Sequence, residues 1–215
     1  FVDVGPDGDN LIRLSAGAND TLTAEIINDH AETITSSKIV VLQNEIPLDA
    51  SLKAAQIAVA AGVLVVMDPA PAPEPFWAPK TLAMFDIVTP NSHETKMITG
   101  HEPRTLSEAK EAARMLQNFG AKGSIVTMGS KGVAWFINGK SGQIAAPEVN
   151  SIDTVGAGDC FNGAFVAIYA SGKPVHVAMT VAVHAAALAT TRKGAAASIP
   201  TCDELDIFTA WALAV

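Results

Sequence analysis

Residues 153–161 read Asp153-Thr154-Val155-Gly156-Ala157-Gly158-Asp159-Cys160-Phe161. Three small residues, Gly156 to Gly158, stand before an apolar run, Phe161 to Ala170, that has the spacing of a helix. The first backbone N–H groups of a helix lack partners within the helix, and the helix dipole makes that end positive. The segment therefore predicts a site for an anion such as phosphate, which can come close because side chains are missing.

Asp159 is a carboxylate in a place where its charge repels the anion that the neighbouring amides attract. A carboxylate beside such a site can accept the proton of an alcohol while the amides stabilise a transferring phosphoryl group. The alternative is a helix N-terminus with an ordinary capping aspartate. This segment alone leaves both interpretations open.

Composition limits the class of protein. The chain has 215 residues, of which 49% are hydrophobic and 17% charged, which is typical of one α/β domain with buried parallel strands. The net charge of −8 argues against nucleic acid or an anionic membrane surface as a partner. The longest apolar runs, such as Ile57 to Met67, are too short to cross a bilayer. With no leader-like segment after Phe1, we expect a cytoplasmic protein.

Strand-like and helix-like segments alternate along the chain. The expected strands are Phe1–Val4, Leu11–Leu14, Lys38–Leu42, Val63–Met67, Ile87–Thr89, Ser124–Met128, Val133–Ile137 and a last one near Gln143–Ala146. The expected helices are one through Ile26, Leu52–Ala61, Phe76–Phe85, one from Ser92, Thr105–Phe119, Phe161–Ala170, Val175–Thr190 and Cys202–Val215, with Ser15–Asp20 as a loop. Turn residues between the first two strands and at Asn138-Gly139 indicate hairpins.

Polar residues follow two of these strands. Glu45 comes just after the strand Lys38–Leu42, at the kind of sheet edge where ligands bind, so it is a candidate for sugar hydroxyls. A solvated loop glutamate is the alternative. Asn91 and Glu94 follow Ile87–Thr89, and Glu94 either orders Mg²⁺ through water or caps the next helix. The sequence leaves both roles of Glu94 open.

Several classes of site are excluded or unsupported. Cys160 and Cys202 form no C-x-x-C pair, so we expect two reduced thiols. None of the five histidines has H-x-x-x-H spacing, and His184 alone is of interest among them. No G-x-x-x-x-G-K-[ST] segment occurs, which excludes a P-loop, and Phe161 replaces the third glycine of a dinucleotide-binding motif.

The motifs together resemble those of the ribokinase/PfkB family of sugar kinases. The resemblance covers the segments Asp153 to Asp159, Thr89 to Glu94, Val126 to Gly132, Thr191 to Ala195 with Ser198 and Pro200, Leu42 to Pro47, and Asp68 to Ala72. They occur in the family's order and spacing from Phe1 to the C-terminus. Any one of them would be a weak signal, whereas agreement of all by chance is negligible. The resemblance implies a three-layer α/β/α fold with a mostly parallel sheet.

The resemblance also implies a role for individual residues. Asp159 would be the catalytic base on the sugar hydroxyl, beside an anion hole of Gly156, Ala157 and Gly158, and Glu45 would hold the sugar with Asp159. ATP would contact Asn91, Thr127, Met128, Gly129, Ser130, Lys131, Gly132, Gly158, Val183 and His184. Glu94 would order Mg²⁺, and K⁺ would be bound by Asp153, Val155, Ala189, Arg192, Gly194 and Ser198. We expect K⁺ to supply the partner that a buried carboxylate at Asp153 would need.

The implied activity is transfer of the γ-phosphate of ATP to a primary hydroxyl of a sugar, with D-ribose preferred. Family members begin with a further N-terminal portion that residues 1–215 do not contain, and residues 1–14 resemble the end of its lid. We therefore expect residues 1–215 to bind ATP·Mg weakly and to show no ribose-dependent ADP release above background hydrolysis. A homodimer is the expected assembly. The alternative is a non-catalytic, nucleotide-binding or merely structural α/β domain.

Overall fold

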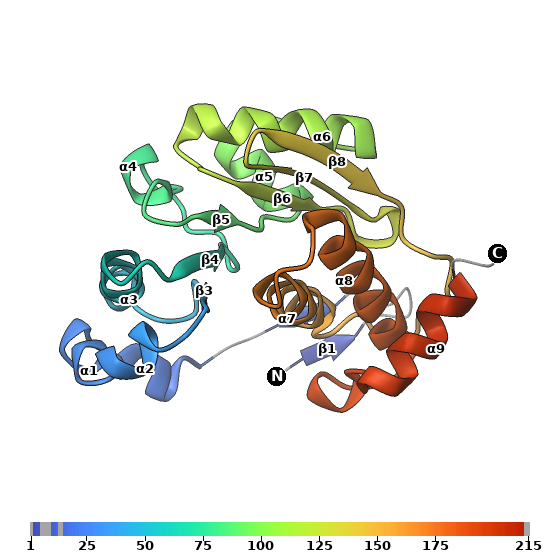
Figure 1. Cartoon of the computed structure of the whole chain (residues 1–215), viewed down its shortest axis with the longest axis horizontal. Helices are drawn as coiled ribbons and strands as arrows, with labels where there is room; N and C mark the ends of the chain where they lie inside the picture. The colour runs from blue at the N-terminus through green and yellow to red at the C-terminus, as the bar shows by residue number, and fades with distance from the viewer. Residues whose placement is uncertain (1, 5–9, 13–14, 213–215) are drawn as a thin grey trace. The chain divides into compact units, whose positions relative to one another are not determined.

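Six strands form one mostly parallel sheet in this computed structural model, which describes residues 2–4, 10–12 and 15–212. The strands lie in the order β3-β4-β5-β6-β7-β8 (Figure 1). Their bounds are β3 Ile39–Gln43, β4 Leu64–Asp68, β5 Ile87–Val88, β6 Ser124–Thr127, β7 Val133–Ile137 and β8 Lys140–Ile144. Strands β3 to β6 are parallel, and β7 is antiparallel to β6. The carboxyl ends of β3 to β6 therefore meet at one edge of the sheet.

The chain packs into two compact units. The sheet unit comprises residues 16–128 and 133–143, and the helix unit comprises residues 1–15, 129–132 and 144–215. The prediction of a single domain stays a prediction.

Helices cover the sheet of the first unit on the face toward which Val65 and Met67 of β4 point. Their bounds are η1 Gly17–Thr21, α1 Ala24–Asp29, α2 Ala31–Thr35, α3 Leu48–Ala60, α4 Pro79–Leu82, α5 Ser92–Thr99, α6 Leu106–Met115 and η2 Leu116–Phe119. Figure 1 shows α3, α5 and α6 on the same side of the strands. Alanines such as Ala54 and Ala113 line the contact and let helices and strands approach closely.

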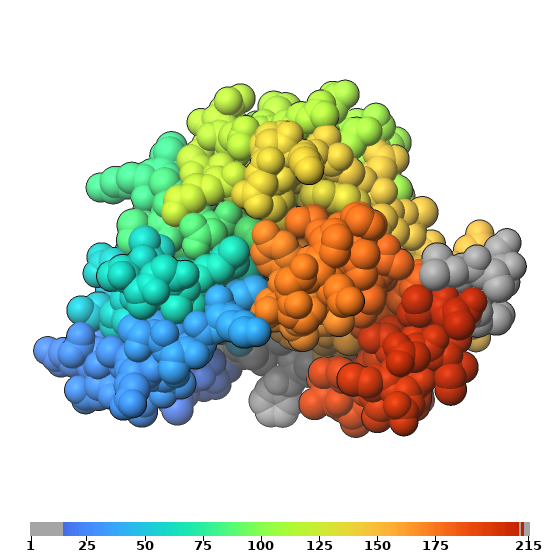
Figure 2. All heavy atoms as spheres, viewed as in Figure 1, coloured from blue at the N-terminus to red at the C-terminus, as the bar shows by residue number. Residues whose placement is uncertain are grey.

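The helix unit is built on three packed helices. Its elements are β1 Val2–Val4, β2 Asn10–Ile12, η3 Gly129–Lys131, α7 Ala157–Ala170, α8 Val175–Thr190, η4 Ala196–Ser198 and α9 Cys202–Ala212. Helix α8 packs against both α7 and α9, and their side-chain atoms adjoin in the space-filling view (Figure 2). Cys160, Ala185 and Ala189 form a small buried cluster at the α7–α8 contact, with Leu205 of α9 against it.

The predicted α/β class and the mostly parallel sheet are confirmed, and the strands fall close to their predicted bounds. The predicted hairpin at residues 1–14 is present as an antiparallel β1–β2 pair, although its turn at residues 5–9 lies outside the described residues. At the second hairpin, Asn138 and Gly139 have φ values of 51° and 75°, as a tight β7–β8 turn requires. The last strand starts three residues before the predicted Gln143 because this turn is only two residues long.

Several predicted elements were wrong in extent. Helix α3 begins at Leu48, four residues before the predicted Leu52. Most of the loop predicted at Ser15–Asp20 lies in the 3₁₀ helix η1, which is too short to show a periodic pattern. The helix predicted at Phe76–Phe85 contracts to α4, because Pro79 forces Ala78 into an extended conformation and Pro79 then suits the first helical turn. Helix α7 begins at Ala157, four residues before the predicted Phe161, so the small residues form its first turn.

The structure also bears on the predictions about the cysteines and about membrane-spanning segments. Cys160 and Cys202 are free thiols, as expected from their spacing. Across the described part of the chain, every helix is too short or too polar to cross a membrane.

Candidate functional site

The N-cap residue of α7 offers no side chain to cap the helix. It is Gly156, with φ 76° and ψ 3°. Ala157, Gly158 and Asp159 occupy the first three helical positions, where backbone N–H groups lack an acceptor within the helix. Ala157 donates its N–H to the Thr154 carbonyl at 3.2 Å. Since a Cβ built on Gly158 would meet nothing within 4 Å, an anion can approach this helix end.

Asp159 lies on the same turn and is exposed. The structure therefore places the predicted base and the predicted amides of the anion hole at one helix end. The positive φ favours glycine at Gly156, and a Cβ there would lie 3.4 Å from the Cα of Ala195, an ordinary contact distance. The loop at residues 191–200 thus passes directly beside the N-cap of α7.

Asp153 joins that loop to the start of α7. Its Oδ1 accepts the Val155 N–H at 3.0 Å, and its Oδ2 accepts the Gly194 N–H at 2.9 Å. The bond from Gly194, followed by that from Val155, lowers the pKa of the Asp153 carboxyl. The expectation that this carboxylate needs a cation as its partner was wrong, because Asp153 is only partly buried and two amides already pair with it.

The other predicted K⁺ ligands belong to the same unit as Asp153. Val155 is two residues beyond it, and Ala189, Arg192, Gly194 and Ser198 lie at the end of α8 and in the loop that follows. The Ala189 carbonyl accepts the Arg192 N–H at 3.2 Å, and the Ser198 hydroxyl donates to the Ala195 carbonyl at 2.7 Å. Carbonyl and hydroxyl oxygens are suitable ligands for K⁺. Among the described residues, no group of three or more His, Cys, Asp or Glu side chains could hold a metal ion. The K⁺ site stays a prediction.

Helix α8 carries the two residues predicted to line an adenine pocket. Val183 and His184 are both 5% exposed. The His184 Nδ1 lies 3.1 Å from the Thr209 hydroxyl of α9, and the ring meets Phe208 edge-on. Burial lowers the pKa of His184, so the neutral imidazole is favoured. His184 thus has a structural partner in α9, and its contact with ATP stays a prediction.

In the sheet unit, Asn91 is the N-cap of α5. Its Oδ1 accepts the Glu94 N–H at 2.9 Å, while the Glu94 Oε2 accepts the Asn91 N–H at 2.7 Å. This reciprocal arrangement is a capping box. Glu94 is 5% exposed, and burial raises its pKa against the opposing effect of the bond from Asn91. The capping alternative for Glu94 is confirmed, and its role toward Mg²⁺ stays a prediction.

Asn91 also lies beside Thr127 at the carboxyl edge of the sheet. The two residues form an isolated parallel bridge, and the Thr127 N–H donates to the Pro90 carbonyl at 3.1 Å. Met128 follows and is buried. Three predicted nucleotide or metal residues, Asn91, Glu94 and Thr127, are thus brought together.

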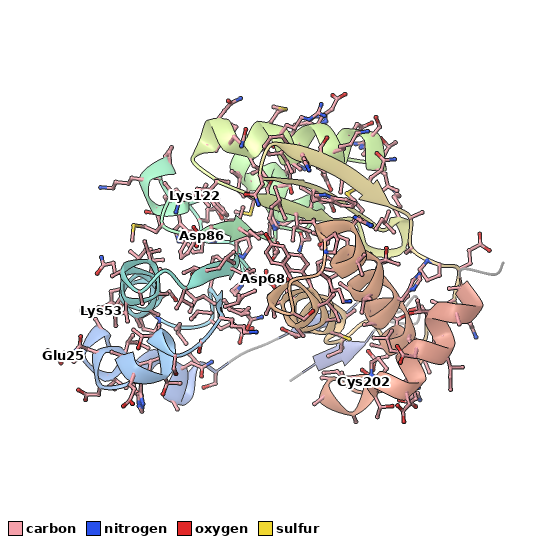
Figure 3. The ribbon with its side chains drawn as sticks, viewed as in Figure 1. Glu25, Lys53, Asp68, Asp86, Lys122 and Cys202 are labelled. Carbon is pink, nitrogen blue, oxygen red and sulfur yellow. The ribbon has the colours of Figure 1, made fainter. Side chains whose placement is uncertain are left out.

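Glu45 lies two residues beyond β3 and is exposed. The loop that carries it is fixed by Asn44, which donates its N–H to the Ala70 carbonyl at 3.0 Å and its Nδ2–H to the Pro71 carbonyl at 2.7 Å. In the side-chain view, Asp68 marks the neighbouring end of β4 (Figure 3). The predicted position of Glu45 past the strand end is confirmed, and sugar binding stays a prediction.

The predicted nucleotide loop Gly129–Gly132 is a tight turn in the helix unit. Gly129 and Gly132 have φ values of 56° and 111°, and the Gly132 N–H donates to the Gly129 carbonyl at 3.0 Å. A Cβ on Gly132 would overlap the Ile144 carbonyl oxygen. Ser130 and Lys131 are exposed on this turn. Only glycine fits at Gly132, so the turn is fixed by its sequence.

Sequence reasoning missed the contacts that α9 makes with this site. Arg192 forms a two-bond ion pair with Glu204, at 3.2 and 2.8 Å, and Thr201 caps the same helix. A signal was present, because Thr201-x-x-Glu204 before a helical segment is the pattern of a capping box. The arginine partner had no such signal, since it lies 12 residues away.

Comparison with known proteins identifies the family. Residues 1–202 match the pfkB family carbohydrate kinases. The chain belongs to this family. It is 38% identical over 204 residues to ribokinase from Haemophilus influenzae, covering 95% of this chain and 66% of that protein. It is 34% identical over 203 residues to deoxyribokinase from Salmonella typhi, covering 94% of this chain and 66% of that protein.

Solved structures show the same likeness in three dimensions. The structure of Arabidopsis thaliana ribokinase complexed with ribose and ATP has a TM-score of 0.86 and 32% identity, covering 97% of this chain and 67% of that one. The ribokinase-like α/β fold is thereby shown. The chain spans about two thirds of the length of the relatives that it matches.

Proposed function

We propose that this chain belongs to an ATP-dependent sugar kinase that phosphorylates a primary hydroxyl, with D-ribose as the first candidate. The observation that carries the proposal is the N-terminus of α7, where the N-cap is a glycine, open space surrounds Gly158, and Asp159 lies exposed on the same turn. The names of the matched relatives, ribokinase and deoxyribokinase, support a pentose as the acceptor.

The chemistry follows from the two groups at this helix end. The Asp159 carboxylate accepts the proton of the sugar hydroxyl as its oxygen attacks the γ-phosphorus of ATP. The bond from that phosphorus to the oxygen that bridges to ADP breaks, and ADP leaves. The amides of Gly158 and its neighbours stabilise the charge on the transferring phosphoryl oxygens. Positioning and electrostatics together supply the acceleration.

Asn91 and Thr127 contact the nucleotide in this proposal, together with Gly129 to Gly132, while Glu45 holds the sugar. Mg²⁺ would neutralise phosphate charge and be held through water by Glu94, since Mg²⁺ prefers few carboxylates and several waters. K⁺ would be held by the carbonyl and hydroxyl oxygens of the loop beside Asp153. That donor set fits a monovalent cation, as the loop offers neutral oxygens around one carboxylate already paired with amides.

A coupled assay of ADP release tests the activity, with D-ribose, 2-deoxy-D-ribose or no sugar present. For the 215-residue chain we expect calorimetry to detect weak binding of ATP·Mg without ribose-dependent ADP release. For a protein in which these residues follow the N-terminal portion of the family, we expect ribose to stimulate ADP release most. Stimulation by deoxyribose alone would move the proposal to that sugar, and failure of both sugars together with failure to bind ATP·Mg would contradict it.

The K⁺ site has a separate test. Replacing Na⁺ by K⁺ at constant ionic strength should raise ATP·Mg affinity or turnover, with choline as the inert control. An equal response to all three ions would remove K⁺ from the proposal.

A second candidate function is nucleotide binding without catalysis. It is favoured by one observation, the coverage of only about two thirds of the relatives' length. ATP·Mg binding without sugar-stimulated ADP release in a protein that also carries the N-terminal portion would support it. For either function we propose a cytoplasmic location, with which the two free thiols agree, and a homodimer as the assembly to test by sedimentation.

A further inference from the structure

A two-bond ion pair ties α9 to the loop beside the start of α7. The Arg192 Nη1 and Nη2 donate to Glu204 Oε2 and Oε1 at 3.2 and 2.8 Å. The same Oε2 accepts the Thr201 N–H at 2.9 Å and the Thr201 hydroxyl at 3.0 Å. Exposed ion pairs usually contribute little, but a planar fork within a network is the exception.

Glu204 is in the first turn of α9, the helix end at which Cys202 is labelled in Figure 3. The bonds from Arg192 and then from Thr201 lower the pKa of Glu204 to about 2, so it is a carboxylate at neutral pH. Asp203 precedes it in the same turn and is exposed. The partner of the Arg192 side chain is therefore a residue of helix α9, Glu204.

The loop continues from Arg192 directly to the phosphate end of α7. Two residues on, the Gly194 N–H donates to Asp153, which also accepts the Val155 N–H. Ala195 comes next and lies beside Gly156, 3.4 Å from the place that a Cβ on this glycine would occupy. On the other side, the Thr190 carbonyl accepts the N–H groups of Ile152 and Asp153 at 2.8 and 3.1 Å. Every step lies within the helix unit.

The loop at residues 191–198 contains small residues that restrict its backbone little. It contains Gly194, with φ 98°, followed by the three alanines Ala195 to Ala197. Ordering such residues costs conformational entropy, most of all for glycine. A fixed Arg192 lowers that cost, because the loop then leaves a defined point only two residues before Gly194.

We propose that Glu204 is a positioning residue for the phosphate site, acting through Arg192 to hold the loop at residues 191–198 against Asp153 and Gly156. This inference rests on the proposed function, because it assigns the loop to the site that binds ATP. The competing explanation is that Glu204 only caps α9 through Thr201.

Four variants separate the two explanations. Glu204→Gln keeps a side chain that a capping box accepts but removes the charge from the fork, and Arg192→Lys keeps the positive charge but loses the fork geometry. Thr201→Ala removes the side-chain cap of α9 and the hydroxyl bond to Glu204 Oε2, but it keeps both members of the Arg192–Glu204 pair. Asp203→Asn removes one exposed charge from the same turn.

Two readouts are taken on the 215-residue chain: hydrogen exchange of the Gly194 and Val155 amides, and the Kd for ATP·Mg by calorimetry. We expect Glu204→Gln and Arg192→Lys to speed exchange at both amides and to weaken ATP·Mg binding about tenfold. Thr201→Ala should lower the melting temperature without either effect, and Asp203→Asn should match the wild type.

Three results would overturn the positioning role while the wild type still binds ATP·Mg. These are unchanged exchange at Gly194 and Val155 in Glu204→Gln, faster exchange with an unchanged Kd, or an equal loss of affinity in Thr201→Ala. A wild-type chain that does not bind ATP·Mg would instead overturn the proposed function, and the positioning role with it.

Discussion

The first turns of helices α5 and α7 both carry an acidic residue, but only α5 has an N-cap side chain that bonds to a backbone N–H of its first turn. The acidic residue is at the third position of each helix, Glu94 in α5 and Asp159 in α7. In α5 the N-cap Asn91 and Glu94 bond to each other's backbone N–H, so the protein itself caps that end. In α7 the N-cap is Gly156, which has no side chain to offer. The first end stabilises the fold, and the second is the end at which we propose that an anion binds.

The acidic residues differ in the same sense. Glu94 is 5% exposed, and its carboxylate is held by the backbone. Asp159 is exposed at the helix end, where a substrate hydroxyl can reach it. The N-cap residue thus distinguishes the two helix ends: Asn91 forms a capping box with Glu94, whereas Gly156 has no side chain with which to form one. The predictions below test this contrast.

The largest expected effect is at Asp159. In a protein that also carries the N-terminal portion of the family, Asp159→Asn should lower sugar-stimulated ADP release by about 10²-fold or more while the Kd for ATP·Mg changes little, because only the proton acceptor is lost. Asp203→Asn, an exposed acid in the first turn of α9, is the matched control and should keep full turnover. Near-normal turnover in Asp159→Asn would show that the α7 carboxylate is as structural as that of Glu94.

The next effect is at Gly158. Gly158→Ala should stabilise α7 by roughly 0.5–1 kcal/mol, since its Cβ meets nothing within 4 Å, yet weaken ATP·Mg binding about tenfold by occupying the anion's approach. Gly163→Ala lies on the same helix with equally open space and should give the stability without the loss of affinity. Chemical denaturation and calorimetry measure the two quantities. Equal affinities for both variants would mean that the α7 end binds no anion.

At α5 the prediction concerns stability. Asn91→Ala removes the side-chain cap and should lower the free energy of unfolding by about 1 kcal/mol in urea denaturation. Asn91→Ser keeps an oxygen that can cap the helix and should recover most of that loss. If Asn91→Ala were as stable as the wild type, the capping box would not distinguish α5 from α7.

The smallest expected effect is on the pH dependence of stability. It concerns His184, which is buried like Glu94 and unlike Asp159. Burial lowers its pKa, so as the pH falls below about 6.5 the unfolded chain binds the proton first. The free energy of unfolding should therefore decrease as the pH falls from 6.5 toward the pKa of the folded state. His184→Gln should lose this part of the pH dependence, and His176→Gln, an exposed site on the same helix, should retain it.

Much of the fold was predictable because its signals are local. The β7–β8 turn follows from Asn138-Gly139, and the end of α6 and η2 follows from Gly120, which has φ 103°. Helix α4 was overestimated because the restriction that Pro79 imposes on Ala78 outweighed an apolar pattern. The site was predicted less completely. The motifs located Asp159 and Asn91 and offered capping as one of two roles for Glu94. Only the coordinates decided that the capping box forms and showed the α9 contacts of His184 and Arg192.

The sequence by itself determined the α/β class and the family, and it predicted the place of an anion site. Those conclusions need only short-range chemistry, such as glycines before a helix and polar residues after a strand. The tertiary structure alone decided how Asp153 is paired, because Gly194 is 41 residues away and no local pattern brings its amide to that carboxylate. It also decided that Glu204 holds Arg192, since a long-range ion pair depends on how α9 packs against α8. Local motifs specify which groups are present, and packing specifies which groups meet.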